Sequence, residues 1–292
     1  MIENYQAVII GGGPAGAAAA LMLARAGWSV AVVEKAGFPR RKVCGEFVSA
    51  TAMPLLRDLG VAESFLRLAG PEVRQVGLFV NDSILTSDMP RADTGGEGAG
   101  GWGRALGREH LDTLLLRHAA EAGATVWQPW TAAALDREGG CHVCRIVARD
   151  KQDVATLRAP VVILAHGSWD PGSLPTQTVQ HVRRPSDLFA FKAHVLDARL
   201  PAGLMPLLVF PGGYGGMVHT DGDRLSLSCC IRREDLDRCR RARPQAGAAE
   251  AVFEHIRSSC RGVREALAGA RLDGAWLSVG PIRPVLHARG LT

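Results

Sequence analysis

The chain has 292 residues, 47% of them hydrophobic and 22% charged, with a net charge of +5 and a pI of about 9.0. This length provides for one large domain or two ordinary ones, and the composition is that of a globular protein. The positive charge comes from scattered arginines. The densest basic stretches, residues 40–42 and 238–241, lack the interleaved aromatic side chains that stack on bases, so nucleic-acid binding is not expected.

The sequence predicts no membrane span and no targeting signal. No apolar run approaches the ~18 residues that a transmembrane helix needs, and no basic lead precedes a cleavable apolar region at the N-terminus. We therefore expect a cytoplasmic protein without a transmembrane segment. Peripheral contact with a membrane and the oligomeric state are left open.

Seven cysteines are scattered along the chain, an odd number in a protein too large to need disulfides, so we expect free thiols. Cys141 and Cys144 have the spacing of half a zinc site, but no second cysteine or histidine pair completes it. Their surroundings, residues 141–148, alternate like a strand. No metal site is predicted.

The first 34 residues predict a complete β-α-β unit. Residues 6–10 (QAVII) form an apolar, β-branched run typical of a buried parallel strand. Residues 14–26 are rich in alanine and leucine, and Gly27 follows them where a helix C-cap belongs. Residues 29–33 (SVAVV) then predict a second strand.

A Gly-x-Gly-x-x-Gly motif lies between this strand and this helix, where dinucleotide-binding proteins place it. Gly11 permits the tight turn, Gly13 lets a pyrophosphate approach the backbone, and Gly16 lets the helix pack closely on the strand. Pro14 suits the first helical position. With Ala15, these residues predict a pyrophosphate site at the helix N-terminus, where free N–H groups and the helix dipole favour anions.

Glu34 ends the second strand, about twenty residues after the glycines. A carboxylate there accepts hydrogen bonds from a ribose 2′-hydroxyl and disfavours a 2′-phosphate. The unit therefore predicts FAD or NAD as the bound dinucleotide.

The next segment favours FAD. Residues 38–45 (FPRRKVCG) match the F-P-R-x-K-x-C-G stretch of geranylgeranyl-reductase-like flavoproteins, a branch of the p-hydroxybenzoate-hydroxylase-type FAD enzymes related to flavin halogenases. The chain resembles this family, which implies FAD contacts from Lys35, Arg41, Cys44 and Gly45. Cys44 and Gly45 are expected nearest the flavin. Cys44 is the candidate catalytic residue, with a packed small thiol as the alternative.

Two later segments extend the resemblance. Residues 104–112 are similar to an R-x-x-x-D element in which the arginine reaches toward the flavin, and Arg108 is the matching residue. The alternative is a surface ion pair between Arg108 and Asp112, four residues apart on a helix. Residues 160–168 resemble an A-D-G-x-x-S turn, with His166 in place of the aspartate.

The middle of the chain suits the family's substrate domain. Residues 72–90 predict a hairpin turning at Asn81, residues 94–103 a glycine-rich loop, residues 185–235 a set of strands, and residues 245–271 helix. The resemblance implies an α/β fold: a Rossmann-like FAD-binding domain with a parallel sheet, helices and a β-meander, interleaved with an α+β substrate domain built on a mainly antiparallel sheet.

The same resemblance divides the chain into five parts. They are the first part of the FAD-binding domain (1–71), a substrate-domain hairpin and loop (72–102), the second part of the FAD-binding domain (103–172), the main substrate domain (173–276) and a short return to the FAD-binding domain (277–292).

A third family signature, G-[D/N]-A-A-G-x-x-x-P, is missing from the sequence. Gly222 and Asp223 are followed by a strand pattern, so they predict a hairpin turn instead. We expect a chain truncated at its C-terminus that retains FAD weakly.

The resemblance implies a FAD-dependent oxidoreductase that takes electrons from a transiently bound NAD(P)H and reduces a small apolar substrate of polyketide or prenyl-lipid type. The alternative on the same fold is monooxygenation of an aromatic or polyketide substrate. Halogenation is less favoured, because residues 127–130 (WQPW) do not match the W-x-W-x-I-P element of halogenases. The alternative outside the enzymes is a truncated remnant that holds little flavin and acts as a binding protein.

Overall fold

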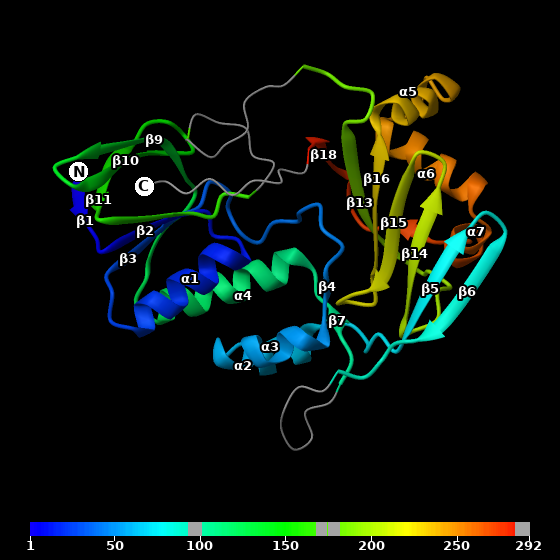
Figure 1. Ribbon diagram of the computed structural model, residues 1–292, viewed down its shortest axis with the longest axis horizontal. Helices are drawn as coiled ribbons and strands as arrows, with labels where there is room; N and C mark the ends of the chain where they lie inside the picture. The colour runs from blue at the N-terminus through cyan, green and yellow to red at the C-terminus, as the bar shows by residue number, and fades with distance from the viewer. Residues whose placement is uncertain (93–100, 168–173, 175–181, 284–292) are drawn as a thin grey trace.

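The computed structural model describes residues 1–92, 101–167, 174 and 182–283. Two halves lie side by side: one is built on short parallel strands with helices, and the other on a large twisted sheet (Figure 1). The strands are β1 (Ile2–Asn4), β2 (Ala7–Ile10), β3 (Val30–Val33), β4 (Phe47–Val48), β5 (Gln75–Val80), β6 (Ser83–Asp88), β7 (Arg104–Ala105), β8 (Thr125–Trp127), β9 (Trp130–Glu138), β10 (Cys141–Ala148), β11 (Val154–Ala159), β12 (Val161–Leu164), β13 (Leu188–Leu196), β14 (Leu204–Phe210), β15 (Gly213–His219), β16 (Leu225–Arg232), β17 (Arg271–Leu272) and β18 (Leu277–Ile282). The helices are α1 (Pro14–Arg25), the 3-10 turn η1 (Ala50–Ala52), α2 (Met53–Asp58), α3 (Ala62–Leu68), α4 (Arg108–Glu121), α5 (Arg233–Ala242), α6 (Ala248–Ser259) and α7 (Arg261–Ala266).

The first half is a three-layer arrangement around a parallel sheet. Its strand order is β12-β2-β3-β8. Strands β2 and β3 are buried along their whole length, as their apolar, β-branched sequences require. Helices α1 and α4 cover one face, and α2 and α3 lie beyond them in the same apolar cluster (Figure 1). The antiparallel meander β9-β10-β11, joined by β1, covers the other face. Trp127 ends β8 and Trp130 begins β9, so both are strand aromatics.

The second half is the large sheet, with the order β17-β13-β16-β15-β14-β5-β6 and β18 paired to β13. Its strand pairs are antiparallel except for β14 and β5. Helices α5, α6 and α7 bury one face under an apolar core. The hairpin predicted at Asn81 is present, with β5 and β6 joined through a left-handed Asn81. Together the two halves confirm the predicted fold class.

The C-terminal strand differs in position from the sequence expectation. Residues 277–282, assigned to the return into the FAD-binding domain, pair as β18 with β13 of the large sheet. Val279 lies directly opposite Ala190 in this pairing, so apolar side chains meet on one face. The glycine-rich loop expected at residues 94–103 lies largely outside the described residues.

Gly222 and Asp223, both left-handed, turn the chain between β15 and β16, so the predicted hairpin turn is confirmed. All seven cysteines are free thiols. Among the described helices, none is long and apolar enough to cross a membrane.

The close packing of α1 on β2 gives a stability prediction. A side-chain carbon added at Gly16 would overlap the Gly11 carbonyl oxygen, which is backbone and has little freedom to move. We expect Gly16→Ala to lower the free energy of unfolding by about 1–3 kcal/mol, as overpacking typically does. Urea unfolding of the purified variant measures this.

Gly37→Ala is the matched control, because no described heavy atom lies within 4 Å of the added carbon. It is expected to change stability by less than about 1 kcal/mol. Equal stability of the Gly16→Ala variant and the parent chain would contradict the packing argument.

Candidate cofactor and substrate site

The turn between β2 and α1 leaves open backbone in front of Gly13. Gly11 is left-handed and lies against the backbone of Ala165, where a side chain would overlap. Gly13, the N-cap of α1, is free of such contacts: the nearest atom to an added side-chain carbon is Arg108 Nη2 at 3.7 Å. Pro14 begins the helix, where its missing N–H removes no hydrogen bond. This geometry exposes the helix N-terminus to an anion.

A groove with a cavity volume of about 320 Å³ runs past this turn, and we call it the glycine groove. Its lining residues are Ile10, Gly11, Gly13, Val33, Glu34, Lys35, Ala36, Arg40, Arg41, Lys42, Trp130, Thr131, Ala132, Ala165, His166, Gly167, Leu174 and Val279. Four of them carry a permanent positive charge, which complements a pyrophosphate. The open glycine backbone, the helix N-terminus and these cations fit a dinucleotide cofactor.

Glu34 lies at the end of β3, buried beside the glycine turn. Its Oε2 accepts a hydrogen bond from Gly12 N at 2.7 Å, and its Oε1 accepts one from Ala36 N at 2.8 Å. The carboxylate therefore holds the glycine turn as well as lining the groove. Each oxygen keeps a further lone pair with which to accept from a hydroxyl group.

Arg41 lines the glycine groove and also joins the two halves of the molecule. Its Nη2 donates to Asp273 Oδ2 at 2.7 Å, and its Nε lies 3.4 Å from Glu109 Oε1. Lys35 lines the same groove. The sequence prediction placed both cations at the cofactor; the ion pairs of Arg41 were not foreseen.

Arg108 forms the ion pair with Asp112 that the sequence offered as the alternative to a cofactor role, but the pair is largely buried and does not lie on the surface. Its guanidinium donates to both carboxylate oxygens of Asp112, at 2.6 and 2.9 Å, and it also lies against the Cys44 thiol. Burial would lower the pKa of Arg108, but the Asp112 carboxylate raises it above its usual range. The ion pair thus holds a charged guanidinium between Gly13 and Cys44.

A short segment, residues 42–46 (the 42–46 segment), separates the glycine groove from a second cavity. Lys42 lines the groove, whereas Val43, Cys44 and Gly45 line the second cavity, which has a volume of about 400 Å³. Val279 lines both. The two cavities therefore adjoin between Lys42 and Val43 and at Val279, next to Cys44 and Gly45, where the resemblance expects the flavin.

The second cavity is mainly apolar, and we call it the apolar cavity. Its floor is the face of the large sheet turned away from α5, α6 and α7. The lining residues are Val43, Cys44, Gly45, Phe47, Ala190, Met205, Leu207, Tyr214, Gly215, Gly216, Met217, Val218, Ser228, Cys229, Cys230, Val279 and Ile282. Leu207, Gly216 and Ser228 lie opposite one another on adjacent strands, so the glycine opens space between its neighbours. Leu207 and Tyr214 are exposed there, which makes this face accessible to an apolar ligand.

A buried charge cluster lies behind the 42–46 segment. Glu46, left-handed with φ 65°, is 4% exposed and faces Lys192 and His194 of β13. Its Oε2 lies 2.7 Å from His194 Nε2, its Oε1 pairs closely with Lys192 Nζ, and Arg108 N donates to Oε1 at 2.9 Å. Burial alone would raise the pKa of Glu46, but the His194 hydrogen bond and the Lys192 charge outweigh it and lower the pKa to about 2.

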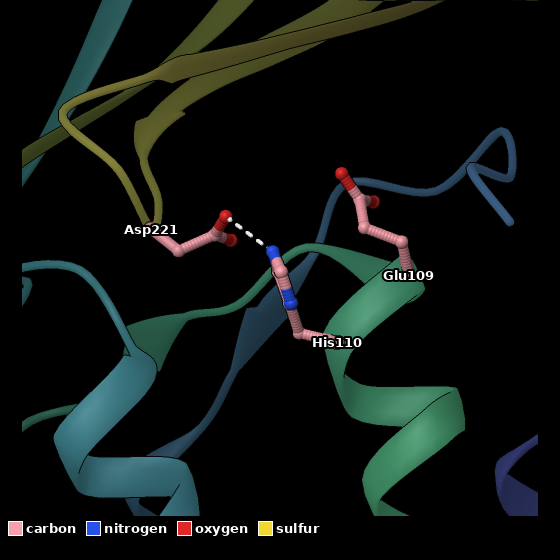
Figure 2. A group of neighbouring side chains, drawn as sticks. All are labelled: Glu109, His110 and Asp221. Atoms are coloured by element: carbon pink, nitrogen blue, oxygen red, sulfur yellow. Dashed lines mark ion pairs between the residues drawn. The ribbon is translucent and has the colours of Figure 1, made fainter. Parts of the chain in front are cut away.

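A second polar group joins α4 to the β15–β16 turn. Figure 2 shows Glu109, His110 and Asp221. One carboxylate oxygen of each acid and one ring nitrogen of His110 all lie within 4.8 Å of one another, and His110 Nε2 is 3.1 Å from Asp221 Oδ2. Arg224 Nη1 donates to Glu109 Oε1 at 2.9 Å, and Arg224 also pairs with Asp221. A positive charge therefore already bridges the two carboxylates, and the arrangement is an ion-pair network between the halves.

The glycine turn, the acid after β3 and the charged groove define a dinucleotide-binding α/β protein. Residues 4–221 match the family model described as FAD binding domain, so the chain belongs to that family. FAD is the cofactor named by this family, and several relatives are named as reductases or flavin-dependent halogenases.

Two curated relatives are reductases. The chain is 28% identical to menaquinone reductase of Mycobacterium tuberculosis over 177 residues, which cover 58% of this chain and 39% of the relative. It is 30% identical to digeranylgeranylglycerophospholipid reductase of Thermoplasma acidophilum over 176 residues, which cover 57% and 40%. These matches confirm the resemblance. The chain spans about two fifths of the length of these relatives.

Solved structures share the fold. The myxobacterial chondrochloren halogenase CndH superposes with a TM-score of 0.79 at 20% identity, covering 96% of this chain and 64% of that one. A geranylgeranyl bacteriochlorophyll reductase-like protein from Thermoplasma acidophilum gives 0.70 at 17% identity, covering 96% and 66%. At these identities the likeness concerns the fold alone.

Three residues of the site were missed by sequence reasoning: Glu46, Lys192 and His194. Lys192 and His194 stand two apart in an otherwise apolar strand, LFAFKAHVL, so they share one face of β13. Charged residues in a buried strand need a partner, and this was the signal available. Their partner, Glu46, lies 148 residues before His194 in the chain.

The lowered pKa of Glu46 predicts an acid-dependent contribution to stability. Because its folded-state pKa of about 2 lies below the ordinary value of 4.5, the stabilisation is complete above about pH 5 and is lost as the pH falls toward 2. We expect the stability difference between the parent chain and Glu46→Gln to shrink by on the order of 3 kcal/mol across this range. Urea unfolding at successive pH values measures it.

Glu63→Gln is the control, because the Glu63 side chain is 94% exposed and its ion pair with Arg67 spans 3.8 Å. Its effect should be small at every pH. A difference between parent and Glu46→Gln that stays constant from pH 6 to 2.5 would contradict the assignment.

Proposed function

We propose that this FAD-dependent oxidoreductase reduces an apolar, lipid-type substrate, with NAD(P)H as a transient electron donor. The observation that carries the proposal is that the glycine groove and the apolar cavity adjoin along residues 42–45, with Lys42 in the lining of the groove and Cys44 and Gly45 in the lining of the cavity. A cofactor bound in the groove would present its reactive end to a substrate in the cavity. The names of two relatives, menaquinone reductase and digeranylgeranylglycerophospholipid reductase, denote reduction of lipidic molecules and support the same substrate class.

The cofactor residues follow from the geometry of the groove. Gly11, Gly13, Pro14, Ala15 and Gly16 form the turn and helix N-terminus that we assign to the pyrophosphate. The Glu34 carboxylate lines the groove and is assigned to the adenosine ribose. The cations that line the groove would balance the phosphate charge.

Bound FAD would supply the electron transfer, and the protein supplies position and environment. The apolar lining of the second cavity removes water from the substrate, while Ser228 and Tyr214 offer hydroxyl groups to a polar end. Cys44 lines the apolar cavity two residues after Lys42 of the groove, with Arg108 beside it, so it is the candidate to hold or donate a proton there. We accordingly assign the large sheet to substrate binding.

FAD titration tests the cofactor assignment. We expect Glu34→Ala to weaken FAD binding by about 1–3 kcal/mol, because the ribose, Gly12 N and Ala36 N each lose an acceptor. Flavin fluorescence quenching or calorimetry gives the affinity, and Glu63→Ala at an exposed position is the control. Unchanged affinity in Glu34→Ala would mean that the ribose binds elsewhere.

Anaerobic turnover separates reduction from monooxygenation. With NAD(P)H and a prenylated quinone, reduction proceeds without oxygen, whereas monooxygenation requires it. Product formation that depends on oxygen would contradict the proposed reduction.

The shape of the apolar cavity gives a prediction on substrate binding. Gly216 lies between Leu207 and Ser228, and a carbon added there would meet its nearest neighbour, Pro206 O, at an ordinary 3.4 Å. We expect Gly216→Val to fold normally and to weaken binding of an apolar probe such as a prenylated quinone about tenfold, because it fills the cavity floor. Binding is followed by fluorescence, with Gly37→Val as the control. An unchanged affinity for the probe would place the ligand elsewhere.

A further inference from the structure

Lys192 is a buried cation with two partners that both belong to one short segment. It lies in β13 and is 1% exposed. Its Nζ donates to the backbone oxygen of Lys42 at 3.3 Å and pairs closely with the Glu46 carboxylate. These partners are the first and last residues of the 42–46 segment.

The segment between these two contacts is the wall shared by the two cavities. Cys44 and Gly45 occupy its middle, and Lys192 itself lines neither cavity. Across the strand pair, Lys192 is opposite Ser228, and an added carbon at Gly45 would lie 3.7 Å from Ser228 Oγ. The Cys44–Gly45 turn therefore rests on the part of the large sheet from which the lysine projects.

The energetics favour a geometric role over a purely stabilising one. Taking an ammonium group and a carboxylate out of water costs several kcal/mol per ion, and well-packed apolar residues at such sites are often equally stable or more so. A lysine at this point of an apolar strand thus indicates a requirement for directed contacts. Its ammonium has three donors, enough to reach both ends of the segment.

We propose that Lys192 is a positioning residue: from the large sheet, it fixes both ends of the 42–46 segment and so sets the place of Cys44 and Gly45 between the cofactor and the substrate. The place of Cys44 and Gly45 between cofactor and substrate rests on the proposed function, whereas the fixing of the segment does not. Lys192 acts through Lys42 and Glu46, and His194 supports it by holding the other oxygen of the same carboxylate.

The test measures the reactivity of Cys44 in the full chain without added cofactor. Lys192→Met removes the charge and both contacts while keeping an unbranched side chain. We expect the rate of Cys44 alkylation by iodoacetamide, read by peptide mass spectrometry, to rise about tenfold. Cys141 is half-buried on β10 and is the internal reference; its rate should stay unchanged.

Two further variants distinguish positioning from general stability. Lys192→Arg keeps a charge and donors, and its Cys44 rate should stay within about threefold of the parent chain. Ile256→Ala opens a cavity in the core on the opposite face of the large sheet, and should lower the melting temperature with no change at Cys44. If Lys192→Met does not fold, Lys192→Gln is measured in the same way, with the same expected rise.

Two results would overturn the proposal: a Cys44 rate in the Lys192→Met or Lys192→Gln variant within twofold of the parent, or a parallel rise at Cys44 and Cys141. The visible circular dichroism of added FAD provides a second readout. It should change in Lys192→Met and not in Ile256→Ala. If the parent chain binds no FAD, the proposed function fails, and the alkylation rates still decide the role of Lys192.

Discussion

The arrangement of the site depends on the buried carboxylate of Glu46. It lies where the 42–46 segment, α4 and β13 meet, and it takes hydrogen bonds from Arg108 N and His194 and the charge of Lys192. An ionised carboxylate is tolerated there only because each of its oxygens has a partner, and the removal of one partner would leave buried charge uncompensated. Through this acid, the large sheet is held in a fixed position against the half built on the parallel sheet, and the two cavities are held in a fixed position relative to each other.

The N-terminus of α4 links the large sheet to the glycine groove in a second way. Gly107, its N-cap, has no side chain, and two acids from outside the helix serve in its place: Asp221 Oδ1 accepts from Gly107 N at 2.6 Å, and Glu46 accepts from Arg108 N. Carboxylates at this end also complement the helix dipole. Arg108 begins α4, and its guanidinium lies near Gly13. The large sheet, which carries Asp221 in its β15–β16 turn, therefore helps to position this guanidinium beside the glycine turn.

The parts of the fold that depend on residues close together in the sequence could be predicted from it. The strand–glycine turn–helix unit and the hairpin at Asn81 follow from local spacing and turn chemistry. The cluster at Glu46 could not, because its members come from distant parts of the chain and meet only when β13 lies beside the 42–46 segment. Glu34 was predicted to face a ribose, and the motif did not reveal that its carboxylate accepts a hydrogen bond from Gly12 N. Family analogy assigned residues 277–282 to the FAD-binding domain, whereas in the structure they pair with β13 of the large sheet.

The central claim is that a flavin bound by this chain lies at the Cys44–Gly45 turn, between the glycine groove and the apolar cavity. A crystal structure of the chain with FAD tests it most directly. The account predicts the pyrophosphate at Gly13 and the N-terminus of α1, the adenosine ribose at Glu34, and the isoalloxazine ring against Cys44 and Gly45 with one face open to the apolar cavity. A flavin ring bound away from this turn, or a dinucleotide outside the glycine groove, would contradict it.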